Sequence, residues 1–168
     1  NDGELLPFPG RKPQHESESS YEIGCYPITN IQFSAFVNDD GYKKQCYWTE
    51  AGWQWRSNNK INAPRDLGEP WNLANYPAIA VSWYEAIAFC SWLTEIYRKH
   101  KKIDGGSWIS LPSEIEWEKA ARGTDKRLYP WGNEPDSEKA NCLATGIGET
   151  SQVGCFFLDA SPYGFHDR

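Results

Sequence analysis

The sequence contains no methionine, and none of its apolar runs approaches the ~18 residues that cross a bilayer. Residues 1–10 also lack the charged-then-apolar plan of a signal peptide. We therefore expect a soluble protein without a membrane partner, located in the cytoplasm rather than secreted. Because the chain starts without methionine, we also expect it to have been excised from something larger.

Positive charge is in short supply. Lysine and arginine number 17 against 23 aspartates and glutamates, for a net charge of -6. Most of such a surface repels a phosphate backbone, so a nucleic acid is not expected as a partner. The one basic cluster, residues 98–102, follows an apolar helical pattern, where cations complement the negative end of the helix dipole.

Cysteine is too sparse and too irregular for a disulfide framework. The five cysteines form no CxxC pair, which argues against a zinc site. Cys90 falls on the apolar stripe of a predicted helix and reads as an inert core thiol. Cys142 and Cys155 flank a glycine-containing loop, where either a disulfide or two free thiols fit.

Aromatic residues are abundant, with nine Trp, nine Tyr and seven Phe. Their N–H and O–H groups need partners when buried, which favours an irregular, loop-rich domain over a helical bundle. The length of 168 residues suits one such domain. We assign residues 1–20 to an extended N-terminal arm and residues 21–168 to the domain.

Capping boxes predict where the helices begin. Ser or Thr is followed three residues later by Glu or Gln at Thr29, Ser82 and Ser113. The predicted helices are residues 30–38, 82–98 and 113–122. Short apolar runs predict strands at residues 21–25, 78–81, 107–111 and 152–157.

The segment 39–75 has no clear periodicity and is interpreted as long loops. Its rings give a large contact area at small entropy cost, so they are candidate ligand contacts. The alternative is that they form the core of an irregular fold. The candidates are Trp48, Trp53, Trp55 and Trp71.

Several ordered blocks together resemble the formylglycine-generating enzyme (sulfatase-modifying factor) domain family. The blocks are YPITN at 26–30, VSWYEA at 81–86, FCSWL at 89–93, LPSE at 111–114, EWEKAARG at 116–123, YPWG at 129–132, AN at 140–141, VG at 153–154 and SPYGF at 161–165. The resemblance implies an α+β, irregular C-type-lectin-like fold with small twisted sheets, two main helices and long aromatic loops.

The resemblance leaves two functions open. Some members are copper-dependent oxidases that convert a sulfatase cysteine to formylglycine, and others are accessory or ligand-binding domains. The oxidase cysteines follow a segment downstream of the SPYGF block, and none of the five cysteines here matches them. We carry over no catalytic residue, and copper is expected only if a further C-terminal part supplies cysteines.

We therefore expect a non-catalytic ligand- or protein-recognition module, incomplete at its C-terminal end. A protein or small ligand would bind the aromatic loops, and a second chain or the chain's own continuation would complete the fold. The alternative is the N-terminal portion of a formylglycine-generating oxidase that matures sulfatases. The resemblance further implies a calcium site near the AN block, to which Asn141 and Glu149 would contribute oxygens.

Overall fold

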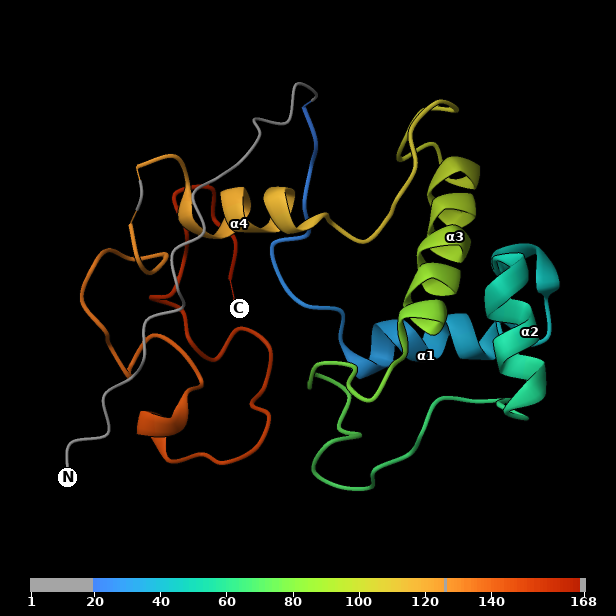
Figure 1. Ribbon diagram of the computed structural model, residues 1–168, viewed down its shortest axis with the longest axis horizontal. Helices are drawn as coiled ribbons and strands as arrows, with labels where there is room; N and C mark the ends of the chain where they lie inside the picture. The colour runs from blue at the N-terminus through green and yellow to red at the C-terminus, as the bar shows by residue number, and fades with distance from the viewer. Residues whose placement is uncertain (1–19, 126, 167–168) are drawn as a thin grey trace. The chain divides into compact units, whose positions relative to one another are not determined.

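The computed structural model describes residues 20–125 and 127–166, and the predicted arm lies almost wholly outside them (Figure 1). These residues divide into two units. The central unit comprises residues 27–111 and 149–153, and the terminal unit comprises residues 20–26, 112–148 and 154–166. No helix in these ranges is both long and apolar enough to cross a membrane.

Two helices of the central unit begin where their capping boxes predict. α1 spans Asn30–Asn38 and α3 spans Trp83–Lys99, and both boxes are formed by reciprocal side-chain and backbone hydrogen bonds. Figure 1 shows α3 standing across α1, with which it is in contact. The predicted boundaries are confirmed to within a residue because the cap chemistry is local.

The loop interpretation of residues 39–75 was wrong for part of that segment. It contains the 3-10 helix η1, Gln45–Tyr47, and the helix α2, Glu50–Asn58. Thr49 caps α2 by accepting a hydrogen bond from the Gly52 amide at 3.0 Å. A Cβ on Gly52 would lie 3.2 Å from the Tyr84 ring, so the glycine permits close packing of α2 against α3.

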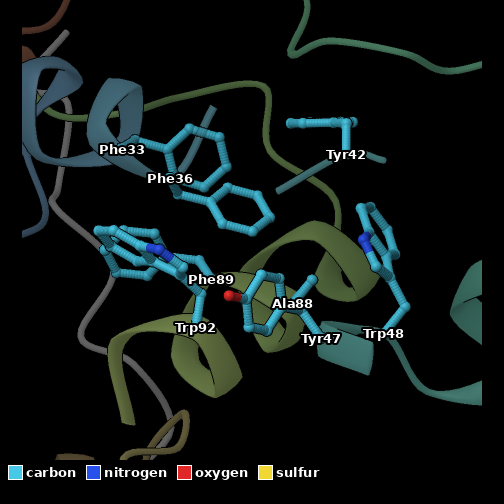
Figure 2. Packing of buried hydrophobic residues seen from close by; sticks show 8 residues of the cluster. All are labelled: Phe33, Phe36, Tyr42, Tyr47, Trp48, Ala88, Phe89 and Trp92. Carbon is cyan, nitrogen blue, oxygen red and sulfur yellow. The ribbon is translucent and has the colours of Figure 1, made fainter. Parts of the chain in front are cut away.

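Aromatic rings make the core of the central unit (Figure 2). The rings meet mostly edge-on or tilted, as between Phe36 and Phe89, whose centroids are 6.1 Å apart. The Tyr42 hydroxyl donates to Glu85 Oε1 at 2.5 Å, which satisfies a buried carboxylate. The buried members are Phe33, Phe36, Tyr42, Tyr47, Trp48, Ala88, Phe89 and Trp92.

The four predicted strands, 21–25, 78–81, 107–111 and 152–157, are not formed within the described residues, so the small twisted sheets of the expected α+β fold are absent there. Extended segments are joined by isolated contacts instead, such as the bridge between Thr29 and Pro77. Two backbone hydrogen bonds flank this bridge, from the Asn30 amide to the Tyr76 carbonyl at 2.9 Å and from the Ala78 amide to the Ile28 carbonyl at 2.8 Å.

The terminal unit is mostly turns around one helix. α4 spans Glu114–Arg122, as its capping box predicts, and the 3-10 helix η2 spans Leu143–Thr145. Gly123 ends α4 with a φ of 73° and donates its amide to the Lys119 carbonyl at 2.8 Å. The buried faces of Ala120 and Ala121 pack with Phe165.

Candidate functional site

A cleft of about 240 Å³ opens in the central unit, between the first turns of α1 and residues 64–81. One wall carries Trp71, a half-buried ring that the sequence marks as a candidate ligand contact. Apolar side chains of α1 and of residues 78–81 also line the cleft. Polar groups stand beside them, from Asn30, Ser34, Arg65, Asp66 and Asn72.

Asn30 fixes the loop that carries Trp71. Its side-chain amide donates to the carbonyl of Trp71 at 2.7 Å and to that of Leu73 at 2.9 Å. Its backbone amide has no partner within α1, because it lies in the first turn, and it donates to the Tyr76 carbonyl at 2.9 Å instead. The backbone of Trp71 is therefore held in place before any ligand arrives.

Asp66 and Arg65, which are adjacent in the sequence, differ in their hydrogen bonding. Asp66 Oδ1 accepts the Gly68 amide at 2.8 Å and the Asn72 side-chain amide at 3.4 Å, so this carboxylate folds its own loop. The exposed Arg65 makes no hydrogen bond or ion pair within the described residues. Sequence reasoning missed Arg65, because one exposed arginine in a loop carries no pattern.

The other three candidate tryptophans lie apart from this cleft. Trp48 is 7% exposed and donates its indole N–H to the Gly41 carbonyl at 2.9 Å, so the alternative of a core ring is the one that the structure shows for it. Trp53 and Trp55 are half-buried on α2. Their predicted ligand role stays a prediction, since both rings also pack against the core cluster.

The candidate calcium ligands, Asn141 and Glu149, are both exposed and belong to different units of the structure. Among the residues that the structure covers, no three His, Cys, Asp or Glu side chains gather into a possible metal site. Calcium takes six to eight oxygens, which include backbone carbonyls. The calcium site therefore stays a prediction.

All five cysteines are free, so the disulfide considered for Cys142 and Cys155 is not formed. Cys90 is buried on α3, and this burial raises the pKa of its thiol, as expected of an inert core residue. No residue of the chain is assigned to copper.

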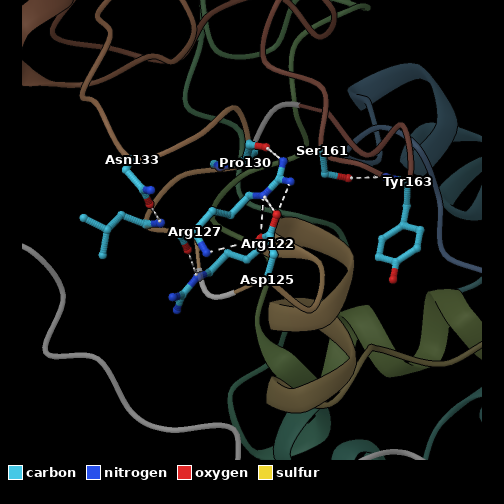
Figure 3. A network of polar contacts seen from close by, with 8 residues as sticks. Arg122, Asp125, Arg127, Pro130, Asn133, Ser161 and Tyr163 are labelled. Atoms are coloured by element: carbon cyan, nitrogen blue, oxygen red, sulfur yellow. Dashed lines mark hydrogen bonds and ion pairs between the residues drawn. The ribbon is translucent and has the colours of Figure 1, made fainter.

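A polar network organises the turns that follow α4 (Figure 3). Arg122 Nε donates to the Arg127 carbonyl at 2.6 Å, and its Nη1 reaches Glu118 at 2.7 Å. Arg127 pairs with Asp125 and donates to the Pro130 carbonyl at 2.9 Å. The hydrogen bond from Arg127 lowers the pKa of Asp125 to about 2. Both arginines are thus committed to shaping their own loop.

A second cluster joins distant parts of the terminal unit. His166 Nδ1 lies 2.5 Å from Oδ1 of the buried Asp159, and the imidazole stacks on Tyr26 with ring centroids 4.9 Å apart. The His166 amide donates to the Cys25 carbonyl at 2.8 Å. These contacts hold residues 25–26, at the end of the predicted strand 21–25, against residues 159–166.

The comparisons with known proteins settle the family. Residues 2–168 match the sulfatase-modifying factor enzyme 1-like domain family, so the chain belongs to the formylglycine-generating enzyme family that its sequence blocks resemble. The predicted membership is confirmed.

Relatives in this family carry different names. Hercynine oxygenase of Mycobacterium tuberculosis is 29% identical over 170 residues, covering 91% of this chain and 36% of the relative. Formylglycine-generating enzyme of Thermomonospora curvata is 28% identical, covering 79% of this chain and 48% of the relative. A serine/threonine-protein kinase, pkn1 of Chlamydia caviae, is 29% identical, covering 88% of this chain and 21% of the relative. The chain thus spans about a third of the length of the hercynine oxygenases that it matches.

Proposed function

We propose that this chain is a recognition domain of the formylglycine-generating enzyme family, and that its ligand binds in the cleft beside Trp71. The observation that carries this proposal is that a large ring, apolar side chains and two polar side chains without a partner in the described ranges, Arg65 and Ser34, line one cleft. Binding sites of small molecules typically combine these features.

The fixed backbone of Trp71 supports the same role. Its carbonyl is held by Asn30, so little loop order remains to be gained on binding. An indole has only two side-chain torsions, which keeps its own entropy cost small. The match to a kinase of Chlamydia caviae, in which the shared part is 21% of the relative, fits a domain that serves within a larger protein.

The test observes the nine tryptophan indole N–H signals by ¹⁵N NMR while a panel of small carboxylates, amides and amines is added. A Trp71→Phe variant assigns the Trp71 signal, and the core residue Trp48 is the internal control. We expect at least one class of compound to shift the Trp71 signal and to leave that of Trp48 in place. If every class leaves the Trp71 signal unmoved, the recognition role of this cleft is wrong.

A second candidate is a portion of an oxidative enzyme. The alignment with hercynine oxygenase of Mycobacterium tuberculosis covers 91% of this chain, and other relatives are named formylglycine-generating enzyme. In such a protein this domain would hold the substrate. For the isolated chain, this candidate is tested by incubation with a sulfatase-type cysteine peptide. Oxidation of the peptide thiol to an aldehyde would support it.

A further inference from the structure

We infer that the cleft takes a small amphipathic carboxylate, with the carboxylate on Arg65 and the apolar part against Trp71. This inference rests on the proposed recognition role and adds the chemical class of the ligand.

Arg65 differs from the other arginines in the described ranges. Each of those donates a hydrogen bond: Arg56 to Asn62, Arg98 to the Ser107 carbonyl, Arg122 to Glu118 and Arg127 to Asp125. Arg65 has no such partner and lines the cleft. A free guanidinium presents a planar fork of donors that matches a carboxylate in two-point contact.

The neighbouring acid leaves the guanidinium of Arg65 unoccupied. Asp66 forms no ion pair with Arg65, and its Oδ1 is held by hydrogen bonds from Gly68 and Asn72 in its own loop. The chain carries a net charge of -6, so an anion is repelled from most of the surface. Arg65 is the one basic side chain among the residues that line the cleft, so an anion that enters would bind there.

The rest of the cleft limits the size and the polarity of the ligand. Its volume of about 240 Å³ is below the ~300–1,000 Å³ of sites for drug-sized molecules. Phe33, Ala78 and Ile79 supply apolar contacts, and the Ser34 hydroxyl, which has no partner in the described part of the chain, offers one hydrogen bond. A single ring or short aliphatic group that bears a carboxylate fits these limits, as a free small molecule.

The experiment measures dissociation constants from the Trp71 indole shift for phenylacetate, its neutral isostere phenylacetamide, and phenethylamine. We expect phenylacetate to bind about fivefold or more tightly than the amide, in the millimolar range of weak fragments. The preference should shrink as salt is raised, because the pair is exposed. A short peptide that ends in a free phenylalanine carboxylate is compared with its C-terminal amide. This comparison tests whether the carboxylate comes from a peptide C-terminus or from a free small molecule.

Variants assign the effect to Arg65. Arg65→Gln should remove the preference for the carboxylate, and Arg65→Lys should keep part of it, since it retains charge without the planar fork. Lys102→Gln is the matched control, because it makes the same change in charge away from the cleft. Val81 of the cleft lies just before the start of α3, whereas Lys102 lies beyond its end, and the helix between them is roughly 25 Å long.

The outcomes separate the two proposals. Equal binding of phenylacetate and phenylacetamide, or a preference that survives Arg65→Gln, overturns the inference and leaves the recognition role standing. Tighter binding of the peptide than of phenylacetate overturns the assignment to a free small molecule. A Trp71 signal that no compound moves removes the recognition role as well.

Discussion

The buried hydrogen bond between Tyr42 and Glu85 gives a direct test of how the central unit is held together. The Tyr42 side chain is enclosed by the aromatic cluster, and its hydroxyl donates to Glu85 Oε1 at 2.5 Å. Glu85 Oε2 also accepts the Ser82 amide at 2.8 Å at the start of α3. A hydrogen bond to a charged group contributes about 1.5–3 kcal/mol, so Tyr42→Phe should lower the free energy of unfolding by about 2 kcal/mol at pH 7.

The same pair predicts a dependence on pH. Burial first, and then the Glu85 carboxylate, raise the pKa of Tyr42 well above its ordinary 10.0. The folded state therefore keeps a proton that the unfolded chain releases, and the stability tied to this group is complete below pH ~10 and declines above it. Between neutral pH and pH 11 the decline amounts to about 1.4 kcal/mol. The gap between the wild type and Tyr42→Phe should narrow by that amount.

Urea unfolding followed by tryptophan fluorescence at several pH values measures this gap. Tyr97→Phe is the control, because Tyr97 is 40% exposed on α3, the helix that carries Glu85. The reasoning is refuted if Tyr42→Phe lowers the free energy of unfolding at pH 7 no more than Tyr97→Phe does. It is also refuted if the free energies of unfolding of the wild type and of Tyr42→Phe change in parallel between pH 7 and pH 11.

Three further outcomes follow from the structure and the sequence. A Cβ on Gly41 would lie 2.1 Å from the Phe36 ring, so Gly41→Ala should lower stability by about 2 kcal/mol or more, whereas the unobstructed Gly105→Ala should not. Ser113 lowers the pKa of Glu116, so Ser113→Ala should cost about 1 kcal/mol in urea unfolding, a cost that shrinks as the pH falls below 4.5. With Cu(I), oxygen, a reductant and a sulfatase-type peptide, mass spectrometry should find no aldehyde above the metal-only control.

The helix starts could be predicted because their chemistry is local. Each capping box lies within four residues, and the boxes that begin at Thr29, Ser82 and Ser113 all form. α2 was missed because its signals are weaker: Gly52 is a poor helix former, and the helix is held by packing against residues more distant in sequence. The strands were overpredicted, since an apolar run does not reveal whether its segment finds a partner strand, and the pairing of Thr29 with Pro77 stays an isolated bridge.

The candidate site was only partly visible in the sequence. Trp71 and Trp48 were both candidates because they are tryptophans. No local sequence pattern distinguishes a tryptophan that lines a cleft from one that is buried in the core. What separates the two is long-range contact: the Asn30 amide holds the Trp71 backbone across 41 positions, while Trp48 closes onto the core. Arg65 gains its significance only from the absence of a partner in the folded central unit.

The central claim, that the cleft beside Trp71 is a binding site, is tested most directly by intermolecular nuclear Overhauser effects to bound phenylacetate. The account predicts effects between the phenyl protons of the ligand and the side chains of Trp71 and Ile79, which both line the cleft. Effects that connect the ligand only to residues outside the cleft, or no effects at ligand saturation, would contradict it.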